Sequence, residues 1–295
     1  MEAIDVLLPY YGNADLFQAA VRSVQKQDYP HWRLIIVDDA YPSEKPMIWI
    51  KSLGDARITY IRNEENLGAN RNYEKALGLA RAGIVVVMGS DDVMLSGYLK
   101  TPAAAFSAHP DIAVVQPGVR VIGEKGQPIW TLTDAVKLIT RPGLLRHEHI
   151  LAGERMACSL LHSGWHYFPS LAWRREIIQS YGFNPVYDVV QDLALLLDIA
   201  AGGGSLLILH DVVFLYRRHN ASDSSVREAD GRRFREEKAF FHNEEHRFSS
   251  LGWSKASRAA RMHWTSRLHA LVVLIRNLRT MDRVTASSLL RHVFT

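Results

Sequence analysis

Short apolar runs alternate with amphipathic segments along the first part of the chain. Ile4 to Leu8 and Leu34 to Val37 are apolar runs too short for helices, and Ile84 to Met88 is rich in β-branched residues. An amphipathic segment that Asn13 can cap separates the first two runs and continues to about Gln27. Because parallel strands need crossover connections, this alternation predicts an α/β fold with a mostly parallel sheet covered by helices.

The alternation continues further along the chain and then loses its period. We predict additional strands and helices at Ile58 to Ile61, Ala69 to Arg81, Ile112 to Val115, Val119 to Ile122, Asp192 to Ala201, Leu206 to Leu209 and Val212 to Tyr216. A polar and aromatic loop, His162 to Pro169, has no clear period.

Length, cysteine content and hydropathy exclude several classes of protein. The 295 residues include a single cysteine, Cys158, so neither an intrachain disulfide nor a cysteine zinc cluster can form. The acidic start is unlike a signal peptide, and no apolar stretch reaches the roughly 20 residues that cross a bilayer. We therefore expect a cytoplasmic protein.

Basic residues are concentrated in the tail. From Ser254 to Thr295 there are eight Lys and Arg residues but a single acidic residue, Asp282, whereas the remainder of the chain is acidic overall. A nucleic-acid-binding protein usually has its basic surface on the main domain, so we expect no nucleic-acid partner.

Two aspartate pairs follow predicted strands. Asp38 and Asp39 come after the second strand, and Asp91 and Asp92 come after the strand that ends at Met88. In an open parallel sheet such residues meet in one crevice at the carboxyl ends of the strands, although aspartates there also form turns and helix caps. Adjacent carboxylates favour a hard cation, Mg²⁺ or Mn²⁺, that also binds phosphate oxygens. The glycine-rich phosphate loops GxxxxGK[ST] and GxGxxG are absent from the expected places.

Six motifs in a fixed order resemble the inverting family 2 glycosyltransferases over about residues 4 to 225. They are Val6-Leu7-Leu8-Pro9-Tyr10-Tyr11, Ile35-Ile36-Val37-Asp38-Asp39, Asn66-Leu67-Gly68-Ala69-Asn70-Arg71-Asn72, Gly89-Ser90-Asp91-Asp92, Val190-Gln191-Asp192 and Tyr216-Arg217-Arg218-His219. The resemblance implies a single-domain GT-A fold over residues 1–225, followed by a helical basic extension over 226–295, and a nucleotide-sugar donor. Residues 1–123 would then bind the nucleotide sugar, and residues 124–225 would hold the acceptor and the catalytic base.

The resemblance assigns donor-binding and metal-binding roles to matched positions. It implies that Pro9, Tyr11 and Asp39 line the nucleoside pocket, with Asp39 accepting a hydrogen bond from a pyrimidine N–H, and that Arg71 lies near the base and diphosphate; a surface arginine on a helix is the alternative. Gly89-Ser90-Asp91 occupies the position of the Asp-x-Asp motif.

At that motif, Asp91 is the principal ligand expected for Mn²⁺ or Mg²⁺, with Asp92 and His219 as further ligands. Ser90 offers a hydroxyl to the donor. Gly89 departs from the usual first aspartate, which places the sugar or ribose contact of that carboxylate in question. For His219, a position on a basic surface loop is the alternative.

The same resemblance places the catalytic base at Asp192. The residue begins an apolar helix, where capping is the alternative role because a negative charge suits a helix N-terminus. Trp165 and His166 are expected to flank the acceptor, or else to pack in the core. His162 and His166 have the helical spacing of metal ligands, but Gly164 between them argues against a regular helix.

These assignments predict a metal-dependent, inverting glycosyltransferase. The donor is expected to be a UDP- or dTDP-sugar and the acceptor a glycan or lipid-linked glycan of cell-surface polysaccharide biosynthesis. A catalytically silent module that binds sugar nucleotides or glycans is the rival interpretation. A nucleotidyltransferase would show a glycine-rich basic signature near its first strand, and this chain has none.

The basic tail is predicted to be one amphipathic helix over Lys255 to Arg283. One sector contains Arg258, Arg261, Arg276, Arg279 and Arg283, and the other sector contains Trp264, Leu268, Leu271, Ile275 and Leu278. Three roles suit such a helix: its apolar side packs on the catalytic domain, it lies on an anionic inner leaflet as a peripheral contact, or it forms an oligomer contact.

Overall fold

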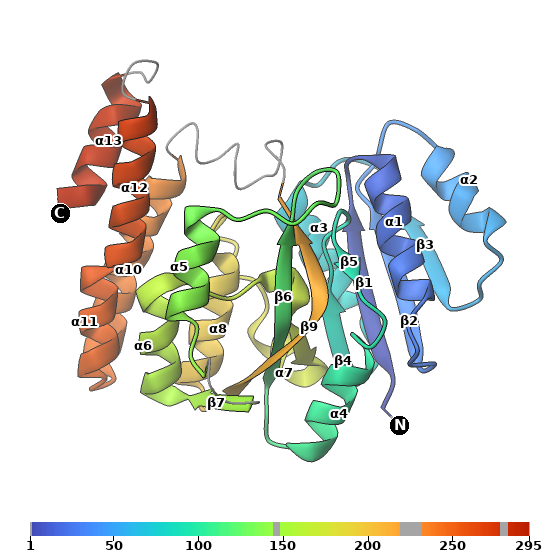
Figure 1. Ribbon diagram of the computed structural model, residues 1–295, viewed down its shortest axis with the longest axis horizontal. Coiled ribbons are helices and arrows are strands. Elements are labelled where there is room, and N and C mark those ends of the chain that lie inside the picture. Colours follow the sequence, from blue (N-terminus) through green and yellow to red (C-terminus); the bar gives the residue numbers. More distant parts are fainter. Residues whose placement is uncertain (1, 144–147, 219–231, 278–282, 295) are drawn as a thin grey trace.

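The computed structural model describes residues 2–143, 148–218, 232–277 and 283–294 (Figure 1). The strands are β1 (Ile4–Tyr10), β2 (Trp32–Asp38), β3 (Ile58–Arg62), β4 (Ile84–Val87), β5 (Val93–Met94), β6 (Val114–Ile122), β7 (Glu148–Ala152), β8 (Ala172–Arg174) and β9 (Ser205–Arg217). The helices of the first part are α1 (Ala14–Gln25), α2 (Lys45–Ser52), α3 (Ala69–Gly78), α4 (Lys100–Ala108), α5 (Leu132–Thr140), α6 (Gly153–Ser163), α7 (Arg175–Tyr181) and α8 (Gln191–Ala201), with a 3₁₀ turn, η1 (Phe168–Ser170). The last helices are α10 (Arg232–Ser250), α11 (Ser254–Met262), α12 (Trp264–Asn277) and α13 (Arg283–Phe294).

Within the described residues, all strands join one sheet in the order β3-β2-β1-β4-β8-β6-β9-β5, and β7 pairs with β9. The β3-β2-β1-β4 portion is parallel, as the alternation predicts. Beyond β4 the pairing becomes mixed, because β8 runs antiparallel to both β4 and β6 while β6 and β9 are parallel. The predicted α/β class is confirmed. The strands of the parallel portion are those of the N-terminal part of the chain, β3, β2, β1 and β4.

Each of two predicted strand pairs is a single long strand. Residues 112–115 and 119–122 were expected to form separate strands, but β6 continues through both, and β9 likewise continues through Leu206 to Tyr216. The register between β6 and β9 shifts at Gly118. A Cβ atom placed there would lie 2.4 Å from the carbonyl oxygen of His210, so glycine permits the close approach that keeps the irregular strands paired.

Helix α1 shows how the local sequence sets an element. Oδ1 of Asn13 accepts hydrogen bonds from the backbone N–H groups of Asp15 and Leu16, at 2.8 and 3.1 Å, as the N-cap prediction requires. The apolar positions Phe17 and Val21 of α1 are fully buried. The helix therefore covers the face of the sheet that presents the even-numbered residues of β1.

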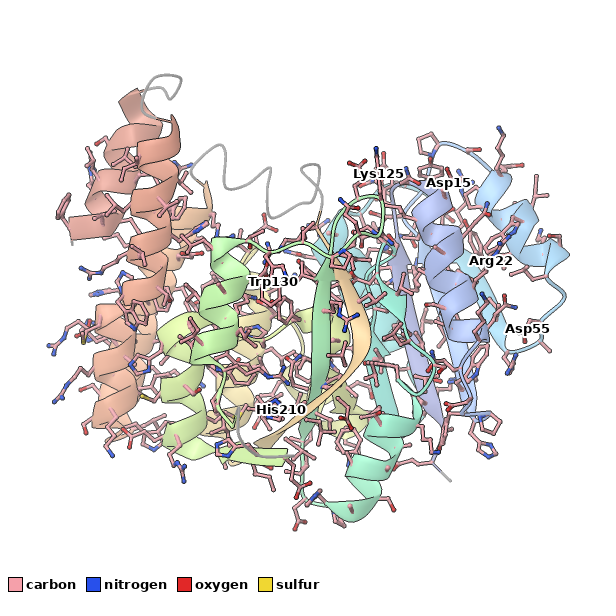
Figure 2. All side chains as sticks on the ribbon, viewed as in Figure 1. Asp15, Arg22, Asp55, Lys125, Trp130 and His210 are labelled. Atoms are coloured by element: carbon pink, nitrogen blue, oxygen red, sulfur yellow. The ribbon has the colours of Figure 1, made fainter. Side chains whose placement is uncertain are left out.

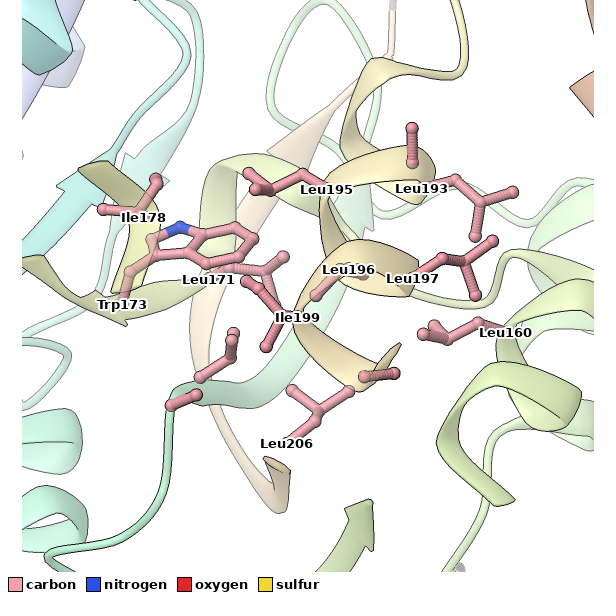
Figure 3. Packing of buried hydrophobic residues seen from close by; sticks show 14 of the residues in the cluster. Leu160, Leu171, Trp173, Ile178, Leu193, Leu195, Leu196, Leu197, Ile199 and Leu206 are labelled. Carbon is pink, nitrogen blue, oxygen red and sulfur yellow. The ribbon is translucent and has the colours of Figure 1, made fainter. Parts of the chain in front are cut away.

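The opposite face of the sheet carries the larger core. Leu7 and Val85 point to this side, where α3, α6 and α8 cover them. Figure 3 shows the leucines of α8 packed between Trp173 and Leu160. The apolar character of α8 on every side matches a helix enclosed between the sheet and further helices.

The C-terminal helices form a layer against α6, at the left of Figure 1. The single helix predicted over Lys255 to Arg283 is wrong, because the chain breaks between α11 and α12 at His263, whose φ is 23°. This break changes which side packs. The buried side chains of α11 are those of Ala256, Ala259 and Ala260, whereas Trp264, Leu268 and Ile275 of the predicted apolar sector are exposed. Leu278, Arg279 and the other residues of 278–282 lie outside the described ranges.

None of the helices in the described ranges combines the length and the apolar character needed to cross a membrane.

Candidate functional site

The carboxyl ends of β1, β2 and β4 meet at one edge of the sheet. Tyr10 pairs with Asp38 in register, and the N–H of Asp39 donates to the carbonyl of Tyr10 at 2.9 Å. Next to β1, the N–H of Met88 donates to the carbonyl of Leu7 at 2.9 Å. We call this the donor edge; it brings together the first, second and fourth motifs, as the strand pattern predicts.

Asp39 is tied into the loop that precedes α3. Its Oδ1 accepts hydrogen bonds from Asn63 Nδ2 and the N–H of Leu67, both at 2.8 Å, and its Oδ2 accepts from the N–H of Gly68 at 2.9 Å. A carboxylate oxygen has two acceptor positions, so Oδ2 keeps capacity for a ligand N–H. Ala40 follows with a φ of 54°, a left-handed conformation that is rare for alanine and typical of functional turns.

The other predicted donor-binding residues differ in their exposure and in their contacts. Pro9 is half-buried and precedes Tyr10, the last residue of β1, and Tyr11 is 55% exposed, with its ring edge-on to Tyr41 at 5.9 Å between centroids. Arg71 is exposed on the first turn of α3. Its neighbour Asn70 makes the structural contact instead, because Asn70 Oδ1 accepts from Gln191 Nε2 at 2.7 Å and so joins α3 to α8.

Two adjacent aspartates in the turn after β4 differ in how buried they are. Asp91 is partly exposed, whereas Asp92 is 1% exposed and its Oδ1 accepts the N–H of Arg217 at 2.8 Å. Burial and the neighbouring Asp91 raise the pKa of Asp92 well above its usual value. A Cβ atom on Gly89 would lie 2.5 Å from Oδ2 of Asp92, so glycine leaves the space that this carboxyl group occupies.

Arg217 holds this turn, a role that the sequence analysis missed. Its Nε donates to the carbonyl oxygen of Asp91 at 2.7 Å, and its Nη1 donates to the carbonyl oxygens of Gly123 and Glu124. The residue belongs to the last motif of the chain, which was the available signal. Arg217 therefore connects β9 to the turn that contains both Asp91 and Ser90.

Asp91 is placed to hold a divalent ion together with a substrate. No group of three or more His, Cys, Asp or Glu side chains arranged for a metal occurs among the described residues. Mg²⁺ and related ions are commonly bound through one or two carboxylates plus phosphates and water, and the partly exposed Asp91 beside Asp92 suits that arrangement. The third predicted ligand, His219, lies outside the described residues.

Asp192 begins α8 and contacts a buried histidine. Nε2 of His166 lies 3.1 Å from Oδ2 of Asp192, and Oδ1 of Asp192 accepts the N–H of Leu193. A carboxylate only accepts hydrogen bonds, so Nε2 of His166 carries the proton. Nδ1 of His166 is buried without a hydrogen-bond partner within the described part of the chain. The side chain of Asp192 remains 29% exposed, so it can still meet a substrate.

Electrostatics keep Asp192 ionised. Burial alone would raise the pKa of this carboxyl group, but His166, the N–H of Leu193 and Lys137 together hold it below its usual value. Lys137 lies on α5, and its Nζ donates to the carbonyl oxygen of His166 at 2.8 Å. Desolvation, with Arg218 nearby, lowers the pKa of Lys137 to about 8.

Trp165 lies in the core and not at an acceptor site. It is 1% exposed, and its Nε1 donates to Oγ of Ser159 at 3.0 Å. The packing alternative therefore describes Trp165, whereas the adjacent His166 does reach the candidate base. Gly164, with a φ of 50°, ends α6 between His162 and His166, which confirms that the two histidines do not share one helix.

A cavity of about 660 Å³ lies beside Asp192. Its walls come from α5 and the residues before it, the start of α8, the end of β9, and helices α10 and α12 of the C-terminal extension. We call it the acceptor-side cavity. Sequence analysis missed Lys137, Arg218 and Trp130 among its lining residues; Arg218 lies in the last motif, while Lys137 and Trp130 lie outside all six motifs.

Tyr216 connects the two regions. Its ring lines the acceptor-side cavity, and burial, with the charges of Asp92, Asp91 and Asp192 among the contributors, raises its pKa to about 12. One phenol therefore lies within electrostatic range of both the turn after β4 and the candidate base. Tyr216 therefore lies between the turn after β4 and the acceptor-side cavity.

Comparisons with known sequences identify relatives for this arrangement. Glycosyl transferase family 2 matches residues 5–182. The "Putative colanic acid biosynthesis glycosyl transferase WcaA" of Escherichia coli K12 is 37% identical over 90 residues, which are 30% of this chain and 32% of that protein. The "UDP-Glc:alpha-D-GlcNAc-diphosphoundecaprenol beta-1,3-glucosyltransferase WfgD" of Escherichia coli is 28% identical over 97 residues, 33% of this chain and 38% of that one. The chain thus spans about a third of the length of these relatives.

Solved structures share the fold over nearly the whole chain. S. aureus TarS 1–349 in complex with UDP-GlcNAc matches with a TM-score of 0.67 at 14% identity, covering 98% of this chain and 79% of that one. The mannosyltransferase PcManGT from Pyrobaculum calidifontis, in complex with GDP-Man and Mn²⁺, matches with a TM-score of 0.59 at 17% identity and the same coverage. The predicted GT-A fold is confirmed, and its helical C-terminal extension falls within the matched region.

Proposed function

The chain belongs to glycosyl transferase family 2, and on that premise we propose that it transfers a sugar from a nucleotide diphosphate sugar to a hydroxyl group of a glycan or lipid-linked glycan. The proposed reaction depends on Mn²⁺ or Mg²⁺ and inverts the configuration at the anomeric carbon. One observation carries the proposal: the ionised Asp192, oriented by His166, lies at a cavity that shares Tyr216 with the turn containing Asp91.

The donor edge would hold the nucleotide. Tyr11 offers an exposed ring to the base, and Oδ2 of Asp39 has acceptor capacity for a pyrimidine N–H. This acceptor suits the ring N–H of uracil or thymine, so UDP- or dTDP-sugars are the proposed donors. Asp91 and the hydroxyl of Ser90 would lie beside the diphosphate, and the bound cation would stabilise negative charge on the leaving nucleoside diphosphate.

Asp192 would act as the general base. An acceptor hydroxyl hydrogen-bonded to its carboxylate loses a proton as the oxygen attacks the anomeric carbon from the face opposite the leaving group. A single displacement of this kind inverts the anomeric configuration. His166 fixes the rotation of the carboxylate and stabilises its charge, so that Asp192 is ionised before the acceptor arrives.

The relatives support the acceptor class of the proposal. The WfgD protein is described as acting on a diphosphoundecaprenol-linked sugar, and another relative from Campylobacter jejuni is described as acting on a PP-undecaprenol-linked glycan. By analogy, we assign this chain to cell-surface polysaccharide biosynthesis. Its place would be the cytoplasm, at the inner face of the membrane where such acceptors are found.

Thermal unfolding in the presence of donors tests the proposal first. UDP-, dTDP-, GDP- and CMP-sugars are screened with and without Mn²⁺, because a ligand at 100 times its Kd stabilises a protein by about 2.7 kcal/mol. We expect one nucleotide to raise the melting temperature in a metal-dependent way. The shift should disappear in Asp91→Asn and persist in Glu124→Gln, a matched acidic control on an exposed turn.

Transfer is then measured with the donor found in this screen and a mixture of polyprenyl-diphosphate-linked sugars. Product anomers are identified by NMR. Donor binding without any transfer or donor hydrolysis would favour a silent binding module, and retention of anomeric configuration would contradict the single displacement at Asp192. Absence of any donor-dependent shift would contradict the donor edge itself.

A further inference from the structure

The acceptor-side cavity lies between the catalytic part of the chain and its C-terminal helices. Helix α5 forms one wall, with Thr133 and Val136 among its lining residues, and α12 forms another, with Ser266 and Val272. His166, which is 5% exposed, marks the inner end of the cavity, and Asp192, whose side chain is 29% exposed, lines the cavity beside it. A substrate that reaches Asp192 through this cavity therefore contacts both walls.

Lys137 brings a positive charge to the inner end. Within the described ranges, no carboxylate lies at ion-pair distance from its Nζ, which donates to the carbonyl of His166 and lies 4.4 Å from the centre of the Tyr167 ring. An ammonium group has three protons to donate, and the carbonyl accepts one of them. Lys137 can therefore donate to a ligand that carries negative charge.

Arg218 adds a second cation beside Lys137. Its Nη2 donates to Oδ1 of Asp134 at 2.7 Å, while its Nε is buried without a hydrogen-bond partner in the described part of the chain. The guanidinium is close enough to Lys137 to lower the pKa of that amine. Because the ion pair with Asp134 offsets part of the charge of Arg218, the donors available to an anion are the Nε of Arg218 and the ammonium group of Lys137.

The outer part of the cavity is apolar. Trp130 and Leu132, at the start of α5, are 77% and 57% exposed, and Leu268 on α12 is 42% exposed. Figure 2 shows Trp130 beside α5. All three side chains line the cavity, so exposed apolar groups from both walls surround its opening. Apolar side chains gathered in this way mark a binding surface more often than a solvent-exposed one.

We propose that the acceptor-side cavity binds the phosphate-linked lipid part of the acceptor, with the phosphate on Lys137 and Arg218 and the hydrocarbon chain along Trp130, Leu132 and Leu268. The inference rests on the proposed function and names the substrate class for it. Lys137 and Asp192 both contact His166, so phosphate and reacting hydroxyl lie on either side of one residue. The C-terminal extension then supplies part of the acceptor site.

Equilibrium binding of farnesyl diphosphate tests this inference without turnover. Isothermal titration is performed in EDTA, which removes metal-dependent binding at the donor edge, and is compared with inorganic pyrophosphate, which lacks the chain, and farnesol, which lacks the phosphates. We expect farnesyl diphosphate to bind at least tenfold more tightly than either. Each comparison removes one of the two interactions that the cavity provides.

Three variants locate the binding. Lys137→Met should weaken farnesyl diphosphate about tenfold, because it removes a charged hydrogen-bond donor. Leu268→Ser, at an exposed position, should weaken it about fivefold and leave pyrophosphate unchanged. Lys51→Met, an exposed lysine on α2 at the opposite end of the molecule in Figure 1, is the matched control and should have no effect.

Several results would overturn the inference. Equal affinity for pyrophosphate would indicate a site for free phosphate, and equal affinity for farnesol would indicate a purely apolar site. No binding of farnesyl diphosphate, or binding that Lys137→Met leaves unchanged, would place the acceptor elsewhere. If these results occur while a nucleotide sugar still binds in an Asp91-dependent way, the proposed function survives; if no donor binds but farnesyl diphosphate does, the proposed function fails by itself.

Discussion

The donor edge and the acceptor-side cavity are constructed differently. At the donor edge, Asp39 directly follows β2 and Asp91 lies in the turn after β4, so the ladder of β1, β2 and β4 sets where these two residues lie. In the acceptor-side cavity, Lys137, Asp192 and Ser266 come from three helices that are far apart in the sequence. The first region follows from local sequence, whereas the second depends on how separate helices pack.

The two regions also differ in how they manage charge. At the donor edge two neighbouring carboxyl groups are held together, and burial of Asp92 together with the charge of Asp91 raises the pKa of Asp92, although the contact with Arg217 opposes this rise. In the cavity, Asp192 has a lowered pKa because His166 and Lys137 offset its burial. The donor edge is thus suited to attract a cation, and the cavity is suited to keep a base ionised.

The largest effect that separates these regions is expected from Asp192→Asn. The amide keeps the shape of the side chain but cannot accept the proton, so kcat should fall by about 10² to 10⁴. Donor affinity, which belongs to the donor edge, should be unchanged in thermal-shift titrations. A variant that loses donor affinity and rate in parallel would contradict the division of the site into two regions.

Trp165 gives the next largest effect, on stability. Its indole fills the core next to α6, so Trp165→Ala should lower the free energy of unfolding by about 3 to 5 kcal/mol. Trp165→Phe should recover much of that loss and leave the KM for the acceptor unchanged. Urea denaturation and acceptor kinetics measure the two quantities separately. A changed KM in Trp165→Phe, with stability preserved, would restore the acceptor role to this residue.

Sequence reasoning succeeds where function depends on residues adjacent to strands. The positions of Asp39 and Asp91 follow from apolar runs that can only be buried strands, and the cap at Asn13 follows from a local hydrogen bond. The α/β class follows from the same alternation. Each of these features is decided within a few residues of the chain, so the pattern contains the information.

The remaining features depend on packing between distant segments. The break at His263 changes the phase of the tail, and the apolar sector with Trp264 and Leu268 becomes exposed instead of buried. Periodicity assumes an unbroken helix and cannot detect that change. Lys137 has no distinguishing neighbours in the sequence; its significance arises because α5 packs over His166.

His166 allows a test of the electrostatic contrast. His166→Ala should lower kcat about tenfold, because a hydrogen bond to a charged group is lost. Burial of Asp192 would then be less offset, so its pKa should rise, and the acid limb of the pH–kcat profile should move to higher pH. His166→Gln, which keeps an N–H donor, should restore part of the rate. An acid limb that stays in place would show that His166 does not set the ionisation of Asp192.

Lys137 provides the smallest effect and the sharpest comparison with the donor edge. Its pKa of about 8 results from desolvation and from Arg218, opposed by Asp192 and Asp134. The amine is charged below that pH and loses its charge above it, with about a tenth still charged one unit higher. The last ionisation of a phosphate group has a pKa near 6, so about nine tenths of the diphosphate is fully ionised at pH 7 and nearly all of it at pH 9.5. The Kd of farnesyl diphosphate should therefore rise several-fold between pH 7 and pH 9.5, while metal-dependent donor affinity should change less.

The variant Lys137→Arg isolates the cause of this pH dependence. Arginine stays charged throughout the range, so its titration should show a nearly constant Kd between pH 7 and pH 9.5. The same rise in the arginine variant as in the wild-type protein would assign the pH dependence to another group. Lys137 lies on α5 and faces a cavity whose opposite wall is α12. A constant Kd in Lys137→Arg would therefore show that the charge on α5 governs binding in a cavity between two helices, although no sequence motif links these helices.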